Sequence, residues 1–155
     1  RWEVVSLPRA DSARVRLLEA PGSSLRLYFP EGQEPRAVMR LQQWLKQHAQ
    51  ASLSGRVHEL SQQTGLTFSR LTFRWQRSRW GSCSSGGAIS LNAKLLFFNQ
   101  DLVDYVILHE LCHLRYFDHS PAFWRLLTQF DPRARQHDKA LGLEAKKVPF
   151  LHRSF

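Results

Sequence analysis

The segment from His109 to His113 reads His-Glu-x-x-His, and it limits what this chain can be more than any other feature does. Residues four apart on a helix share one face, so His109 and His113 can present two imidazoles to one metal ion. Glu110 lies about 100° around the helix, where its carboxylate can reach a water molecule beside the metal without being a ligand. A third neutral ligand from the following segment would leave a fourth position for water. That layout is typical of a catalytic zinc site rather than a structural one.

The alternative is a pair of histidines on a solvated helix face with an incidental glutamate. The surrounding residues argue against it, because they are apolar nearly all round and predict a buried helix: Leu102, Val103, Tyr105–Leu108, Leu111 and Leu114. Buried His and Glu side chains need partners, and a metal ion supplies one. The sequence therefore favours Zn²⁺ as the cofactor.

Composition points to an ordinary globular chain. Its 155 residues, 43% of them hydrophobic, predict a single domain over residues 1–155, and we expect a monomer. There is no apolar run near 18 residues, so we expect no membrane span. The two cysteines, Cys83 and Cys112, favour free thiols and hence a cytoplasmic protein.

Positive charge is concentrated in the N-terminal half. Residues 1–80 hold 13 Lys and Arg against 6 Asp and Glu, a net of +7, whereas residues 81–155 hold 9 against 7, a net of +2. A nucleic acid or an acidic protein would suit this half, and a solvated basic surface would explain it equally well. Four arginines at positions 70, 74, 77 and 79 alternate with aromatic residues, as on a nucleic-acid surface, but a half-buried strand gives the same pattern.

Strand and helix patterns alternate along the chain and predict an α+β fold. Period-two alternation predicts an antiparallel pair of strands at 13–18 and 24–29, then strands at 69–75 and 88–92 separated by a Gly/Ser-rich loop at 81–87. Helical spacing runs from Pro35 to Gly65, with a break expected at Ser54-Gly55. The metal helix should begin after Asn99 or Asp101 and run to about Tyr116. Two further helices should follow Ser120 and Asp131, the last ending near Gly142.

Several short motifs occur in a fixed order along the chain: Arg79–Cys83 (Arg-Trp-Gly-Ser-Cys), Ile89–Asn92, Asp104–Val106, His109–Leu114, Asp118–Ser120 and Phe123-Trp124. Together they resemble the YgjP-like metallopeptidase family, related to the SprT-like and WLM zinc proteases, over roughly Arg14 to Leu143. The resemblance implies a zincin-like fold in which a small, mostly antiparallel sheet packs on the metal helix. It divides the domain into N-terminal strands and a long helix (13–65) and a metal-binding part (69–143). It also implies that His109, His113 and His119 bind zinc and that Glu110 is the catalytic base.

Two competing arrangements concern the third ligand. Metzincins share the six-residue step from the second to the third histidine, but they have glycine where this chain has Tyr116, which disfavours that class. Peptide deformylases use an upstream cysteine, which would make Cys83 the ligand in place of His119. Asp118 could orient His119 through a hydrogen bond or act as a turn residue. The other histidines, at positions 48, 58, 137 and 152, are expected on the surface.

The expected function is zinc-dependent hydrolysis of a protein or peptide substrate that lies extended along a sheet edge. Arg79, Trp80 and Tyr116 are candidate substrate contacts, although Arg79-Trp80 could equally anchor a loop. Tyr105 or Tyr116 could stabilise the reaction intermediate or simply pack in the core. Two alternatives stay open: a non-catalytic, zinc-stabilised module that binds nucleic acid or protein, and a DNA-associated protease of the WLM or SprT type.

Overall fold

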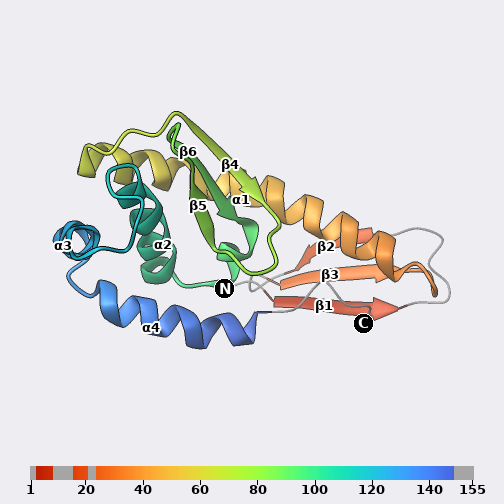
Figure 1. Ribbon diagram of the computed structural model, residues 1–155. Helices are drawn as coiled ribbons and strands as arrows, with labels where there is room; N and C mark the ends of the chain where they lie inside the picture. Colours follow the sequence, from red (N-terminus) through yellow and green to blue (C-terminus); the bar gives the residue numbers. More distant parts are fainter. Residues whose placement is uncertain (1–2, 9–15, 21–23, 149–155) are drawn as a thin grey trace.

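The computed structural model describes residues 3–8, 16–20 and 24–148 and has an α+β fold, as predicted. In chain order the elements are β1 (Glu3–Pro8), β2 (Arg16–Ala20), β3 (Ser24–Phe29), α1 (Glu34–Thr64), β4 (Arg70–Arg74), β5 (Gly81–Cys83), β6 (Ala88–Asn92), the 3₁₀ helix η1 (Ala93–Phe97), α2 (Gln100–His113), α3 (Pro121–Phe130), α4 (Ala134–Glu144) and the 3₁₀ helix η2 (Ala145–Lys147) (Figure 1). None of the helices in the described ranges is long and apolar enough to span a membrane.

The strands form two three-stranded sheets, ordered β1-β3-β2 and β4-β6-β5. β2 and β3 pair antiparallel, as expected, with Leu17 opposite Leu27. Each sheet also has one parallel pair, β1 with β3 and β4 with β6, so the pairing is mixed rather than mostly antiparallel. In the second sheet a tight turn joins β5 to β6, and these two strands pair antiparallel. The other edge of β6 pairs with β4, and that pair is parallel.

Helix α1 is a single, unbroken helix that contacts both sheets (Figure 1). Its buried side chains recur at helical spacing: Ala37, Leu41, Leu45, Ala49, Leu53, Val57 and Leu60. The expected break at Ser54-Gly55 is wrong, because the buried face of the helix continues on both sides of these residues, at Leu53 and Val57. The predicted end is correct, since Gly65 adopts the left-handed conformation (φ 70°) that terminates helices.

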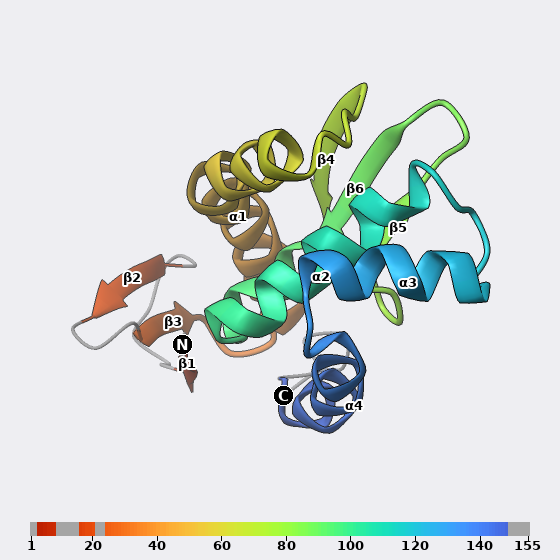
Figure 2. The ribbon, with the colours of Figure 1, turned by 90° about the vertical axis from the view of Figure 1, so that its left-hand side faces the viewer.

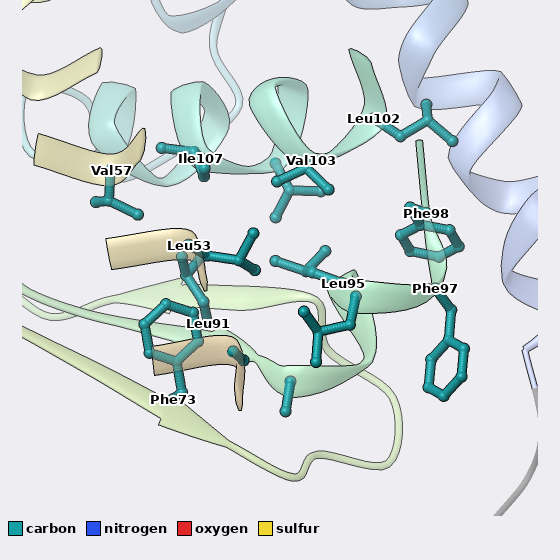
Figure 3. Packing of buried hydrophobic residues seen from close by; sticks show 14 of the residues in the cluster. Leu53, Val57, Phe73, Leu91, Leu95, Phe97, Phe98, Leu102, Val103 and Ile107 are labelled. Atoms are coloured by element: carbon teal, nitrogen blue, oxygen red, sulfur yellow. The ribbon is translucent and has the colours of Figure 1, made fainter. Parts of the chain in front are cut away.

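Helix α2, the predicted metal-binding helix, lies between α1 and the second sheet on one side and α3 and α4 on the other (Figure 2). Val103 and Ile107 face Leu53 and Val57 of α1 across the core (Figure 3). Asn99 caps the helix by accepting from the Leu102 amide (3.0 Å). The last helical residue is His113, three before the expected end, and the chain then turns toward α3.

The ends of the two following helices match the sequence unequally. Ser120 caps α3 as predicted, accepting from the Phe123 amide (3.4 Å). Helix α4 starts at Ala134 and passes through Gly142 to end at Glu144, so the predicted stop at that glycine is wrong. A glycine in a final turn stops a helix only where the backbone turns left-handed, and no positive φ occurs there.

The segment predicted as a loop at 81–87 is the main error near the metal helix. Its first three residues form β5, which pairs with β6 through Gly81 opposite Leu91 and Cys83 opposite Ile89. Only the turn that follows is irregular, and Gly87 supplies its positive φ of 78°. A strand of three residues is too short to show the alternation of apolar and polar residues that predicts a strand. Its partner strand and the α2 helix beneath it determine its conformation.

Candidate metal centre

Three imidazoles converge where α2 ends. One helical turn separates His109 from His113, and their Nε2 atoms lie 3.2 Å apart. His119 comes from the segment between α2 and α3, and its Nε2 atom lies 3.0 Å from that of His109. The ligand atoms of all three residues fall within 4.8 Å of one another. Among the described residues, this is the group of His, Cys, Asp and Glu side chains that could hold a metal ion.

These spacings suit a tetrahedral ion bound by nitrogen. Zinc–imidazole bonds of about 2.0–2.1 Å at tetrahedral angles place neighbouring nitrogens about 3.3 Å apart. Three neutral imidazoles also leave a fourth position open, as in catalytic zinc sites. The competing ligand Cys83 lies outside the group. Burial, and then the charge of Glu110, raise the pKa of its thiol, which disfavours the thiolate that a metal requires.

A hydrogen bond holds one of the three imidazoles in the tautomer that a metal needs. The Nδ1 atom of His113 lies 2.9 Å from the Tyr116 carbonyl oxygen. A carbonyl can only accept, so Nδ1 carries the hydrogen and Nε2 keeps its lone pair. Burial lowers the pKa of His113 and, reinforced by the charges of His113 and His119, lowers the pKa of His109 to about 4. Both rings are therefore neutral near pH 7.

Phe123 on α3 is the apolar support of the cluster. It is fully buried, and its ring centroid lies 4.9 Å from that of His109, 4.6 Å from that of His113 and 5.0 Å from that of His119. The His113 ring stacks on it with an interplanar angle of 27°. Because α3 begins at Pro121 after the cap at Ser120, Phe123 falls in its first turn, next to the histidines. A single side chain thus restrains all three imidazoles.

Glu110 is the buried carboxylic acid of the site, with 6% of its surface exposed. Burial raises its pKa to about 7, against a smaller lowering by the positive charge of Arg79. Its carboxyl group lies directly beneath Gly81 of β5. A Cβ atom at that glycine would stand 2.6 Å from Glu110 Cγ and 2.7 Å from Oε1. Gly81 therefore leaves the space that the carboxyl group occupies.

A pocket of about 290 Å³ opens beside these groups. It is lined by residues of α2, α4, the start of β5 with the segment before it, and the segment between α2 and α3: Arg79, Trp80, Gly81, Tyr105, Val106, His109, Glu110, His119, Asp138 and Leu141. The predicted substrate contacts Arg79 and Trp80 are among them, whereas Tyr116 contributes to the site through its carbonyl. Arg79-Trp80 is also an anchored loop, since the Asn92 side chain donates to the Arg79 carbonyl (2.8 Å) and Trp80 packs edge-on against Phe98.

The Tyr105 hydroxyl donates to Asp138 Oδ1 on α4 (2.8 Å). Burial, and then this hydrogen bond, raise the pKa of the phenol, so it stays a donor. Sequence reasoning did not identify Asp138, and no local pattern marks it. Gly81 was inside a quoted motif, but its role is visible only with Glu110 packed against it.

The remaining polar candidates have structural roles. Asp118 accepts from the Ser120 amide (3.3 Å), as a turn residue does. His58 is exposed as predicted, whereas His137 is tucked against Asp131 (2.6 Å) with its side chain 13% exposed, so its surface prediction is wrong. His48 stacks on Trp44, and position 152 lies outside the described residues. Cys83 and Cys112 are both free thiols, as predicted.

Comparison with known proteins agrees with this geometry. Residues 11–143 match the family model described as the YgjP-like metallopeptidase domain. The chain is similar to the jannalysin metallopeptidase zymogen of Methanocaldococcus jannaschii, with 19% identity, a TM-score of 0.53, and coverage of 61% of this chain and 97% of that one. It is also similar to the abylysin zymogen of Pyrococcus abyssi, with 24% identity, a TM-score of 0.49, and coverage of 56% and 89%. The jannalysin match shows a shared fold. No curated protein sequence matches the chain.

Proposed function

The chain belongs to the YgjP-like metallopeptidase family, and we propose that it hydrolyses peptide bonds with a zinc ion held by His109, His113 and His119 and with Glu110 as the general base. One observation carries the proposal. Three imidazole Nε2 atoms converge, those of His113 and His119 lying 3.2 and 3.0 Å from that of His109, beside a buried carboxyl group that faces the same pocket. The family match supports a metallopeptidase, and the donor set supports zinc.

The chemistry divides between the ion and the protein. Zinc, when bound, supplies a Lewis acid that polarises a peptide carbonyl and makes water acidic enough to attack near neutral pH. Glu110 accepts a proton from the attacking water as the new carbon–oxygen bond forms. It then gives that proton to the amide nitrogen as the carbon–nitrogen bond breaks, so the products are a carboxylate and an amine. Gly81 keeps the Glu110 carboxyl group in position for both transfers.

The substrate would lie along β5. This strand is at the edge of its sheet, and the residues that lead into it, Arg79 and Trp80, line the pocket. An extended peptide could add to the edge as a further strand, with main-chain hydrogen bonds fixing its direction and the pocket receiving one side chain. Arg79 is exposed and positively charged, so it would favour a substrate with a carboxylate near the scissile bond.

Glu110→Gln is the variant that tests this function. Wild type and variant are expressed and loaded with zinc, and bound metal is measured by mass spectrometry. Hydrolysis is followed on casein and on a fluorogenic peptide library. The amide keeps the shape of the side chain but cannot accept the proton, so we expect one equivalent of zinc with turnover reduced at least about 100-fold. Glu31→Gln makes the same change at an exposed turn and should match wild type.

Each result points to a different conclusion. Unchanged turnover in Glu110→Gln would reject Glu110 as the base. A wild type that binds zinc but cleaves nothing would favour the non-catalytic binding module. Expression without added metal, followed by reloading with zinc, cobalt or manganese, identifies the ion that supports activity.

One observation favours a second candidate, a nucleic-acid partner. Arg70, Arg74, Arg77 and Arg79 are all exposed, and no Asp or Glu occurs between Glu59 and Asp101. Arg70 and Arg74 lie on β4, and Arg77 and Arg79 lie in the segment that leads from it to β5 at the pocket, as a protease acting on DNA-bound proteins would require. Anisotropy with a labelled 20-mer DNA should show binding that weakens steeply from 50 to 200 mM salt. Arg70→Glu/Arg74→Glu should abolish it, and salt-independent binding would reject the surface.

A further inference from the structure

The histidine pair on α2 is supported unequally. The Nδ1 atom of His113 bonds to a backbone carbonyl, which no substitution removes. The Nδ1 atom of His109 faces a side chain instead, the hydroxyl of Tyr105 one helical turn earlier, at 3.4 Å. That hydroxyl donates to Asp138 Oδ1 at 2.8 Å. His109, Tyr105 and Asp138 therefore form a chain of polar contacts from the three histidines to α4.

The direction of hydrogen bonding along these contacts follows from valence. A tyrosine hydroxyl has one hydrogen, and Tyr105 donates it in the hydrogen bond to Asp138, since a carboxylate can only accept. Toward His109 the Tyr105 oxygen can then only accept. The hydrogen of the neutral imidazole is thereby drawn to Nδ1, and Nε2 presents its lone pair to the other two imidazoles. This is the tautomer in which His109 can bind a metal ion.

The far end of this chain of contacts is the carboxylate of Asp138, which is exposed on α4. Tyr105 is 2% exposed and is one of the residues that line the pocket. Helix α4, which carries Asp138, packs on α2. Its first turn is held at the corner after α3, where His137 contacts Asp131 at 2.6 Å and the Asp131 carboxylate also accepts from the Arg133 amide. The part of α4 that carries Asp138 is thus held in place by contacts that do not involve the three histidines.

We propose that Asp138, acting through Tyr105, is a positioning residue for His109, so that packing of α4 against α2 contributes to metal affinity. Neither residue is a ligand. Removing either should leave His109 free to adopt the other tautomer or to rotate, each of which weakens the site. The inference rests on metal binding by His109 in the proposed function, and it extends the metal site to a helix that supplies no ligand.

The test measures zinc affinity in the absence of substrate, because Asp138 also lines the pocket and could affect turnover directly. Tyr105→Phe, Asp138→Asn and the double variant are titrated with zinc against a competing chromophoric chelator. The visible absorption of the cobalt-loaded proteins reports the ligand geometry. Tyr28→Phe, in β3 far from the cluster, is the matched control. Melting of the metal-free proteins shows whether each variant still folds.

We expect Tyr105→Phe to weaken zinc binding about 10- to 100-fold, with Tyr28→Phe unchanged. Because Asp138 acts through Tyr105, the zinc affinity of the double variant should be no lower than that of the single variant with the lower affinity. A Tyr105→Phe affinity within threefold of wild type would overturn the positioning role, whatever Asp138→Asn does, since the phenylalanine removes only the hydroxyl. A wild type that does not bind zinc would instead overturn the proposed function itself.

Discussion

Gly81→Ala tests how closely β5 fixes the catalytic carboxyl group. The added Cβ atom would stand 2.6 Å from Glu110 Cγ and 2.8 Å from Cδ. Carbon atoms in ordinary contact are separated by about 3.4 Å or more, so the carboxyl group has to move by about 0.8 Å. A displacement near 1 Å of a catalytic group costs about 100-fold in rate, equivalent to about 2.7 kcal/mol. We therefore expect kcat/KM to fall about 100-fold while His109, His113 and His119 still bind zinc.

The protein should still fold, with a melting temperature lowered by only a few degrees. Overpacking costs about 1–3 kcal/mol, and each kcal/mol lowers Tm by about 2–4 °C in a chain of this size. The assay compares hydrolysis of one fluorogenic peptide by the zinc-loaded proteins, together with zinc content and Tm. Gly86→Ala is the control from the next turn, where the nearest atom to an added Cβ is Ser84 Oγ at 3.9 Å. Activity in Gly81→Ala within threefold of wild type would refute the placement of Glu110 beneath this strand.

Four further substitutions test the centre and the contact of α2 with α1. His119→Ala should weaken zinc binding by more than about 100-fold, which is the upper limit for a residue that only supports a ligand. Cys83→Ala should keep its full zinc content. The reverse result would make the cysteine the third ligand. Phe123→Ala should cost about 3–5 kcal/mol in urea unfolding and also weaken zinc binding, because all three imidazoles lose their apolar support; normal zinc affinity would contradict that role. Asp104→Asn removes a two-bond pair with Arg56 (2.6 and 2.9 Å) that joins α2 to α1, and should cost about 1 kcal/mol with zinc affinity unchanged; a loss of metal would show that the pair also shapes the site.

Patterns with a short range were readable from the sequence. The spacing of His109 and His113, the cap at Asn99 and the cap at Ser120 all act within one helical turn, so neighbouring residues suffice to predict them. The six-residue step to His119 adds only a short turn. The single-domain, monomeric and cytoplasmic expectations stay predictions.

Features that depend on distant segments were missed for a physical reason. Asp138 is 33 residues from the hydroxyl it binds, and an aspartate on a short helix carries no sign of a partner on another helix. His137 looked like a surface residue because only the packing of α4 against the α3 corner buries it. The break expected at Ser54-Gly55 weighed local propensity alone, whereas the buried face of α1 continues from Leu53 to Val57 and keeps the helix intact.

The strand that sequence reasoning mistook for a loop connects several parts of the proposed mechanism. As a flexible loop, residues 81–83 could not hold a carboxyl group to within an ångström, nor offer a straight edge for a peptide. Pairing with β6 gives β5 both properties, since the ladder fixes Gly81 over Glu110 and leaves the other edge of the strand available within the described sheet. The residues entering the strand also line the pocket. A substrate aligned on β5 would therefore be placed relative to Glu110 by the same backbone that places Glu110. Substitutions that disturb the pairing with β6 should for this reason impair binding and catalysis together.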